Sequence, residues 1–417
     1  MSQHSEPIET GSMDSEEAKS RPIETAVVVL PGNGESDWPG ATVAGLTIVE
    51  RNLMGLKSVG VRTVHLVTEE SVMETVQRVL DRLGNDSRKP EIHVHTAGQS
   101  EVVVLNERFL RVDGRRLFHN NLLKEAVHRP GEFAYVDAEG KDAGLSAGAG
   151  GTRFLSGIPD SVDRVPIPAG TFSQLADTPD SRKKAAKLVY LSLIKPGDGW
   201  FSKNLNRPIS LSISRVLVKY PIHPNVVTGF TFLVGLLAGF FSALGSYWGF
   251  AVGGVLYQLG SILDGVDGEI ARVKFLGSRA GQWMDTICDD MSNVVYLTGV
   301  TIGTWRAMES HLLLGAGLAA VTLDVLVVAL LYRQLLKQKA GTLLDFEWDV
   351  QKPDRQEKLS SRIIASLGPL IRRDCYAVLF MIFALAGVAW VALYATAVGM
   401  SITLVVLIAQ LSKTGAK

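Results

Sequence analysis

Cysteine is scarce in this chain of 417 residues, where only Cys288 and Cys375 are present. Two isolated thiols exclude a disulfide framework and a cysteine-rich metal cluster. Both lie in apolar runs, so we expect small buried side chains. An excess of one charge is also missing, since the formal net charge is +0. Bulk charge therefore gives no reason to expect nucleic acid as a partner.

The first residues lack the features of a signal peptide. Residues 1–22 are polar and rich in Ser and Glu, with neither a basic n-region nor an apolar h-region. We interpret residues 1–24 as a disordered tail. The domain that follows, residues 25–178, is therefore expected to stay in the cytoplasm.

Short β-branched runs alternate with helical patterns in residues 25–178. This alternation predicts a Rossmann-like α/β domain with a parallel sheet. His93 and His95 alternate on one strand face, but no third ligand stands out in the sequence, so we expect ordinary strand positions. The predicted strands are residues 26–30, 63–68, 91–95 and 102–105, and the predicted helices are residues 46–56 and 71–83.

Long apolar runs fill residues 223–417, and a membrane-spanning helix needs about 20 mainly apolar residues. A turn between the last two runs is expected at residues 387–390. The linker, residues 179–222, holds an amphipathic pattern at 206–219 that suits a helix at the bilayer surface; an ordinary surface helix is the alternative. The six candidate spans lie near residues 224–245, 248–273, 278–304, 311–337, 374–388 and 391–412.

Basic residues gather on one side of these predicted spans, whereas the connections on the other side carry almost none apart from Arg306. The positive-inside rule then places the N-terminal domain and the C-terminus in the cytoplasm. We expect an integral protein of the cell or inner membrane. The basic residues are Arg272, Lys274, Arg279, Lys337, Lys339, Arg372 and Arg373.

Four carboxylates interrupt the second and third predicted spans. Asp264 and Asp267 are three residues apart, and Asp285 and Asp289 are four apart, so each pair shares one face of its helix. Carboxylates inside a membrane are costly and usually functional. If the two helices pack antiparallel, the pairs converge. Convergent oxygen ligands suit Mg²⁺ or Mn²⁺, and such a site can hold two ions about 3.5–4 Å apart.

Small residues and an arginine accompany these carboxylates. Gly268 lies one turn past Asp264 and leaves room for a ligand near the backbone, while Gly281 permits close helix contact. Arg272 lies two turns past Asp264 and could reach a phosphate. Divalent cations and arginine together indicate a substrate that carries a pyrophosphate. A membrane transporter with an acidic core, used as a proton relay or ion pathway, is the alternative of a different class.

The block Asp264-x-x-Asp267-Gly268-x-x-Ala271-Arg272, eight residues, then Gly281-x-x-x-Asp285-x-x-x-Asp289 resembles the signature of the CDP-alcohol phosphotransferases. Such enzymes transfer a phospho-alcohol from a CDP-alcohol to an acceptor hydroxyl and release CMP. The resemblance covers the chain from about Lys195 onward. It implies six transmembrane helices, usually in a homodimer, and a cavity open to the cytoplasm.

The resemblance also implies roles for individual residues. The four aspartates would bind two metal ions, and Asp289 would also be the general base for the acceptor hydroxyl. Asp290, next to it, points well off the metal-binding face. The CDP moiety would be held by Asn225, Thr228, Gly268, Ala271, Arg272, Gly277, Ser278 and Gly281.

The segment before the first span indicates a class of acceptor. Residues 195–202, 206–207 and 214–215 are similar to the fused inositol-phosphate enzymes, the di-myo-inositol-phosphate-phosphate synthases, which pair a cytidylyltransferase domain with this membrane domain. A phospholipid synthase that takes CDP-diacylglycerol is the alternative within the class. The basic residues that could hold an acceptor phosphate, each alternatively a snorkelling interfacial charge, are Arg207, Arg215, Arg279 and Arg333.

The N-terminal domain resembles a sugar-phosphate nucleotidyltransferase in its first strand and the Gly32-x-Gly34 turn. In that family a glycine-rich loop cradles the phosphates of the nucleotide. This sequence departs from the pattern, because Glu35 and Ser36 stand where an arginine is usual. Residues 106–107, Asn-Glu, also stand where an aspartate ligand is expected. We interpret the domain as a degenerate nucleotidyltransferase without activity.

Overall fold

The computed structural model describes residues 21–32, 37–97, 107–149, 162–195, 197–338 and 372–414. The chain divides into two compact units, Met1–Ser192 and Leu193–Lys417. The boundary falls inside residues 179–222, the predicted linker. The predicted features that lie outside the described residues are the tail at 1–20, residues 33–36 of the glycine-rich turn, the strand at 102–105, Asn106 and Lys339.

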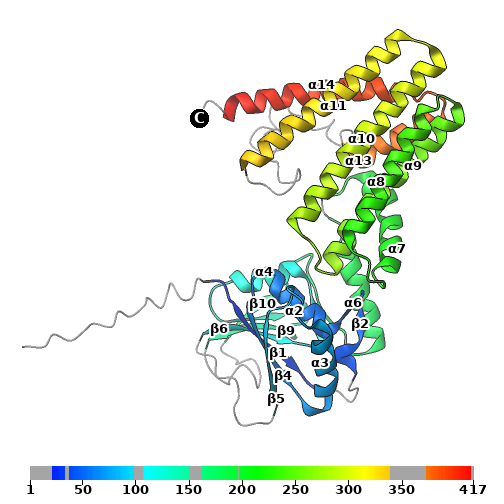
Figure 1. Cartoon of the computed structure of the whole chain (residues 1–417). Coiled ribbons are helices and arrows are strands. Elements are labelled where there is room, and N and C mark those ends of the chain that lie inside the picture. Colours follow the sequence, from blue (N-terminus) through cyan, green and yellow to red (C-terminus); the bar gives the residue numbers. More distant parts are fainter. Residues whose placement is uncertain are drawn as a thin grey trace, which may run out of the picture. The chain divides into compact units, whose positions relative to one another are not determined.

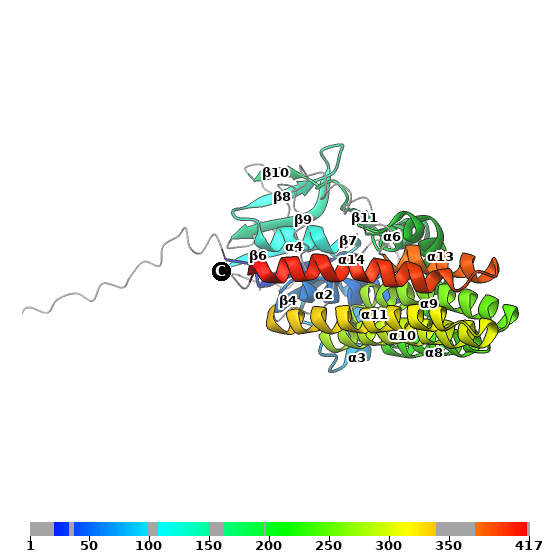
Figure 2. The ribbon, with the colours of Figure 1, turned by 90° about the horizontal axis from the view of Figure 1, so that it is seen from above.

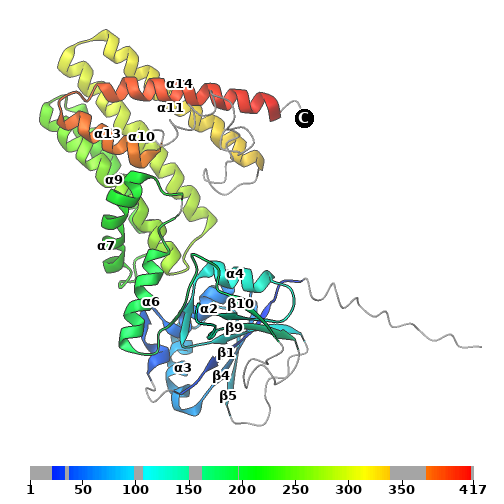
Figure 3. The same ribbon diagram turned by 180° about the vertical axis from the view of Figure 1, so that it is seen from behind.

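A seven-stranded sheet forms the centre of the first unit, in the order β10-β8-β9-β6-β1-β4-β5. The order can be followed from β9 through β1 and β4 to β5 (Figure 3). Val27 and Phe109, on neighbouring strands, pack in its core with Ala134 and Val162. The strands are β1 (Thr25–Leu30), β4 (Thr63–Thr68), β5 (Glu91–Thr96), β6 (Arg108–Asp113), β8 (Phe133–Val136), β9 (Asp142–Ala149) and β10 (Asp163–Pro166).

The sheet is mixed, which corrects the prediction of a parallel one. Strands β6, β1, β4 and β5 run parallel to one another, but β9 runs antiparallel to both β6 and β8. The sequence of β9 is rich in Ala and Gly. It therefore carries few of the β-branched and aromatic residues by which strands are recognised, and the antiparallel member of the sheet was missed.

The described part of the first unit also contains four α-helices. Helix α2 begins with a capping box, in which Thr47 and Glu50 satisfy each other's backbone amides. Two small antiparallel ladders join β2 (Thr42–Val43) to β3 (Leu46–Thr47) and β7 (Arg116–Phe118) to β11 (Ser173–Leu175). The helices are α2 (Ile48–Ser58), α3 (Glu70–Leu83), α4 (Asn120–His128) and α6 (Pro179–Leu191).

The second unit is helical, and its long helices match the predicted apolar runs closely (Figure 1). The amphipathic segment forms η2 (Ser202–Asn206) and α7 (Arg207–Leu217), and the last turn lies between α13 and α14, as predicted. Helices α11 and α14 pack side by side (Figure 2). The long helices are α8 (Pro224–Ala243), α9 (Tyr247–Val273), α10 (Arg279–Met308), α11 (His311–Gln338), α13 (Arg373–Leu385) and α14 (Val391–Thr414).

Four of these helices are long and apolar enough to cross a membrane: α8, α9, α11 and α14. The predicted count of six is not confirmed. Helix α10 has 30 residues but carries several charges, and α13 has only 13 residues. At 1.5 Å per residue, α13 covers about 20 Å, less than the roughly 30 Å of a hydrocarbon core.

Glycines bring α8 and α10 into close contact. A β-carbon on Gly239 would lie 2.6 Å from the carbonyl oxygen of Val295, and one on Gly299 would collide with the carbonyl of Gly239. Gly303 meets the carbonyl of Ser242 in the same way. Small residues four apart are the usual means by which membrane helices approach closely. We call Gly239, Gly299 and Gly303 the glycine seam.

Candidate active site

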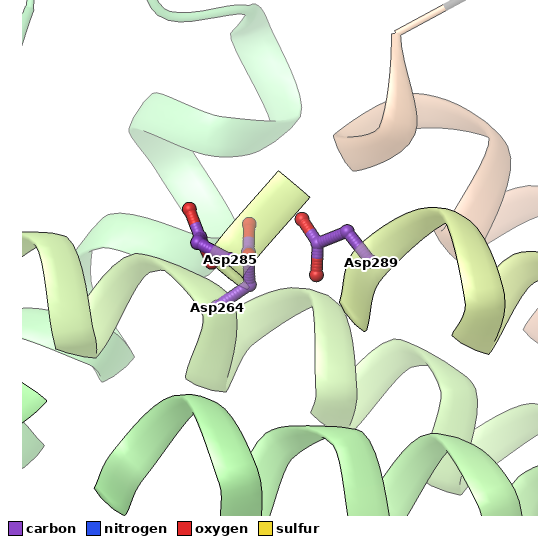
Figure 4. Close-up of side chains that lie close together, drawn as sticks. All are labelled: Asp264, Asp285 and Asp289. Carbon is purple, nitrogen blue, oxygen red and sulfur yellow. The ribbon is translucent and has the colours of Figure 1, made fainter. Parts of the chain in front are cut away.

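Three carboxylates of neighbouring helices converge in the second unit. Asp264 lies on α9, and Asp285 and Asp289 lie on α10, one turn apart. One oxygen from each can be chosen so that all three lie within 4.8 Å of one another. Figure 4 shows the three side chains pointing toward a common point. All three are half-buried, so a small ligand could still reach them.

A tight turn sets this arrangement. Helix α9 ends at Val273 and α10 begins at Arg279. Phe275 between them has a left-handed backbone, with φ of 55°. Ser278 caps α10 by accepting a hydrogen bond of 3.0 Å from the amide of Gly281. The carboxylates of α9 and α10 therefore face each other across the end of a helical hairpin.

Asp267 lies deeper than the other three carboxylates and is only 4% exposed. It accepts hydrogen bonds from the Thr228 hydroxyl of α8 and from the amide of Gly268. Its carboxyl also contacts that of Asp285. The structure thus brings all four predicted aspartates into one cluster, and Thr228 ties it to α8.

Arg373, the first residue of α13, provides a positive charge beside the cluster. Its Nη1 contacts the Asp289 carboxylate and lies 3.5 Å from Asp264 Oδ1. From the sequence, Arg373 is expected only as one of the basic residues on the cytoplasmic side. Arg373 lies more than 80 residues after Asp289, so local spacing does not predict their contact. The one signal in the sequence is that an arginine begins a short apolar helix.

The donor set fits a divalent metal ion. Carboxylate oxygens are the ligands that Mg²⁺ and Mn²⁺ prefer. The close approach of Arg373 shows that the cluster already binds one cation of the protein itself. Which ion the aspartates take, and how many, stays a prediction.

Several residues predicted to hold the CDP moiety meet at the N-terminus of α10. A β-carbon on Gly281 would lie 3.0 Å from Ser278 Oγ and 3.2 Å from Asn225 Oδ1. Asn225 comes from the first turn of α8, and Gly277 immediately precedes the cap. A helix N-terminus with close polar groups suits an anionic group.

A basic cluster lies beside the end of α9. A β-carbon on Gly268 would lie 3.3 Å from Arg272 Nη1, so the guanidinium folds back over the glycine. Ala271 precedes it on the same helix. Burial, then the charges of Arg272 and Arg207, lower the pKa of Lys195. Lys195 was not predicted as a site residue, because it lies in the connection before α7.

The four predicted acceptor residues lie on three helices, α7, α10 and α11. Arg207 forms ion pairs with Asp198 at 2.9 Å and with Glu269 at 2.8 Å, and its side chain is 11% exposed. It therefore helps to fix α7 against α9. Arg215 on α7, Arg279 at the start of α10 and Arg333 on α11 are exposed.

Other buried polar groups of these helices face away from the cluster. Asp290 accepts a hydrogen bond from the hydroxyl of Tyr332, in keeping with its predicted place off the metal face. Asn293 donates to Asp324 at 2.9 Å and accepts from Tyr257 at 2.6 Å. These contacts join α9, α10 and α11 around the candidate site.

Residues 221–402 match the family of the CDP-alcohol phosphatidyltransferases. The bifunctional IPC transferase and DIPP synthase of Aquifex aeolicus is 40% identical over 135 residues, which cover 32% of this chain and 30% of that protein. The enzyme of the same name from Thermococcus kodakarensis is 39% identical over 146 residues, covering 34% and 33%.

A third relative, the archaetidylinositol phosphate synthase of Pyrococcus horikoshii, is 31% identical over 91 residues, which cover 22% of this chain and 47% of that protein. The chain thus matches about a third of the length of the first two relatives and about half of the third. The family match confirms the resemblance predicted from the aspartate block.

Proposed function

We propose, on the premise that residues 221–402 are a CDP-alcohol phosphatidyltransferase domain, that this protein is a membrane phosphotransferase. It would move a phospho-alcohol group from a CDP-alcohol to an acceptor hydroxyl and release CMP. The observation that carries the proposal is the convergence of Asp264, Asp285 and Asp289 within 4.8 Å, in the matched region.

Asp264, Asp267, Asp285 and Asp289 would hold two Mg²⁺ or Mn²⁺ ions, whose charge offsets that of the donor diphosphate. The contacts of Arg373 with Asp264 and Asp289 support this assignment, because they show where a cation is stabilised. Thr228 would keep Asp267 in place through its hydrogen bond.

The chemical step needs one base and one oriented donor. Asp289 takes the proton of the acceptor hydroxyl. The hydroxyl oxygen attacks the phosphorus distal to cytidine, the new P–O bond forms, and the bond to the CMP oxygen breaks on the opposite side. The N-terminus of α10, with Asn225, Ser278 and Gly281, holds the donor, and Arg272 is placed to neutralise its phosphates.

For the substrate we propose a polyol of the inositol-phosphate type. The names of the Aquifex and Thermococcus relatives support a soluble head group as donor or acceptor. Lys195 lies near Arg272 and Arg207 beside the end of α9 and suits an acceptor phosphate. The site opens to the cytoplasm, as the positive-inside rule predicts, and the protein is a homodimer.

A lipid donor is the second candidate, and one cavity favours it. A cavity of about 280 Å³ lies mainly between α13 and α14, with walls that are almost entirely apolar. An apolar chain of a CDP-activated lipid would fit there, and the Pyrococcus relative carries the name of a lipid synthase. Its lining includes Tyr376, Phe380, Phe383, Val398, Met400 and Ile402.

The decisive experiment measures CMP release by the purified full-length protein with Mn²⁺. One arm pairs CDP-inositol with inositol phosphate, and the other pairs CDP-diacylglycerol with inositol phosphate. We expect release in the first arm; release in the second alone would assign the lipid reaction. No CMP from either pair would favour a transporter with an acidic core and contradict the proposal.

Asp289→Asn tests the general base, with Asp290→Asn as the matched control. We expect Asp289→Asn to lower the rate of CMP release by about 10²–10⁴-fold, with donor binding by calorimetry largely intact. Asp290 contacts Tyr332 instead of the cluster, so its variant should lose far less. Equal rates in the two variants would remove Asp289 from the role of base.

A further inference from the structure

We propose that His65, His93 and His95, in the first unit, form a binding site for one transition-metal cation of the zinc class. This site is separate from the aspartate cluster. From the sequence, His93 and His95 are expected to occupy ordinary strand positions, because no third ligand stands out. The structure brings a third imidazole, His65, to the same face of the sheet from the neighbouring strand.

The register of two parallel strands gathers the three rings. His65 on β4 pairs with His93 on β5, and Val67 pairs with His95 two residues along. Side chains two residues apart share a face, so all three imidazoles point to one side. The His65 ring stacks against both others, with centroids 5.1 Å from His93 and 5.2 Å from His95.

Two ring nitrogens already lie at a ligand-like separation. His65 Nδ1 is 3.0 Å from His95 Nε2. Two nitrogens bound at about 2.0–2.1 Å to one tetrahedral zinc ion are about 3.3 Å apart. A small opening of this pair, with the rings turned toward a common point, therefore admits a cation between them.

His93 supplies the third ligand. Its Nε2 lies 3.3 Å from Glu91 Oε1, which leaves Nδ1 for a metal. A carboxylate on the far nitrogen is the usual partner of a metal-binding histidine, because it fixes the tautomer and raises the basicity of the ring. The His93 side chain is 46% exposed, so it has room to turn toward His65 and His95.

The donor atoms determine which kind of cation the site would take. Imidazole ligands favour Zn²⁺, Co²⁺, Ni²⁺ and Cu²⁺ over the hard cations that suit the aspartates.

The position of the cluster suggests what a metal would do. Strand β5 is at the edge of the seven-stranded sheet. A cation bound by His65 of β4 and by two histidines of β5 would cross-link the edge strand to its neighbour. An edge strand has hydrogen-bonding groups free on one side and is readily detached or paired with another chain, so the metal would stabilise this part of the unit.

Cobalt spectroscopy on the full-length protein, without a histidine tag, tests the proposal. We titrate Co²⁺ alone and record the visible absorption of tetrahedral nitrogen-bound cobalt. One equivalent with this band is expected in the natural protein and in Asp285→Asn, which alters only the oxygen site. His95→Gln should abolish the band, and His128→Gln, an exposed histidine on α4, should retain it.

Glu91→Gln provides a milder test, because it leaves the three imidazoles and the strand in place. Loss of the carboxylate partner should weaken Co²⁺ binding about 10-fold. Circular dichroism of each variant verifies that the sheet is retained. No tetrahedral band at saturating Co²⁺, a band unchanged in folded His95→Gln, or unchanged affinity in Glu91→Gln would each overturn the proposal.

Discussion

Arg373 is the residue on which the charge balance of the aspartate cluster depends. Its guanidinium contacts Asp289 and Asp264, and its side chain is 19% exposed. Removing one partner of a buried ion pair costs far more than the pair contributes, because a charge is left without compensation. A bound divalent ion would replace that compensation.

Arg373→Gln is therefore expected to lower the free energy of unfolding of the metal-free protein by about 3 kcal/mol. With saturating Mn²⁺ the loss should be much smaller. Thermal unfolding in detergent, with and without Mn²⁺, measures both values. Arg372→Gln is the control, since the half-exposed Arg372 contacts Asp374 and the carbonyl oxygen of Gly197 instead of the clustered aspartates. Equal losses in both conditions would contradict the stated role of Arg373.

For individual residues, the sequence predicted a contact only where the two residues in contact lie near each other in the chain. Asp264, Asp267, Asp285 and Asp289 lie on two consecutive helices, so helical spacing alone predicted that they could meet. The contact of Arg373 with Asp289, and that of His65 with His95, join different elements. Local spacing carries no information about such pairs, and both were missed.

Among the elements, α10 connects the site to the membrane-spanning core. Its first half carries Asp285 and Asp289, and its second half packs on α8 through the glycine seam. Helix α8 in turn supplies the hydroxyl of Thr228 to Asp267. The distance between α8 and α10 therefore affects the positions of the aspartates.

Gly299→Ala should destabilise the protein by about 1–3 kcal/mol, because the added methyl group collides with the carbonyl of Gly239. Chemical denaturation in detergent measures the change. Gly229→Ala on α8 is the control, since a β-carbon there has no neighbour within 4 Å. If both variants were equally stable, α8 and α10 would not be in the close contact described.

Glu269 holds α7 to α9. It is fully buried and accepts hydrogen bonds from Ser210 at 2.7 Å, from Ser214 at 2.6 Å and from Arg207 at 2.8 Å. Glu269→Gln is expected to cost about 3 kcal/mol, because it leaves Arg207 with one charge partner fewer. Thermal unfolding measures the loss, with the exposed Glu309→Gln as control. A stability equal to that control would show that the interaction is unimportant.

Helices were easier to predict than strands. The long apolar runs predicted the bounds of the long helices of the second unit within a few residues, because the length of an apolar run does not depend on the elements that pack beside it. The strands depend on their neighbours. Strand β9 has small residues and takes its place only because β6 and β8 lie on either side, so neither its existence nor its antiparallel direction followed from its sequence.

For the whole molecule, the division after Ser192 separates two units with their own cores. The four clustered aspartates, and the entire region matched by the family, belong to the second unit. The histidine cluster belongs to the first unit. Every residue to which we assign a role in the proposed transfer reaction therefore belongs to the second unit.

A truncated protein that begins at Leu193 should insert into membranes and release CMP at a rate of the same order as the full chain, since domains with their own cores commonly fold alone. CMP release by the purified truncated protein checks this. The Asp289→Asn version of the same truncation is the control for background. Complete loss in a folded, inserted truncation would give the first unit a direct part in the transfer.

The shortness of α13 has a consequence for how a charged nucleotide reaches a site among membrane helices. With 13 residues this helix covers only about 20 Å, and Arg373, its first residue, touches the aspartates. The hydrocarbon core of a bilayer is about 30 Å thick, so α13 is about 10 Å too short to cross it, and a helix this short draws water and head groups inward at one end. If that end is the one that carries Arg373, we expect a diphosphate to meet the aspartates without entering the hydrocarbon core.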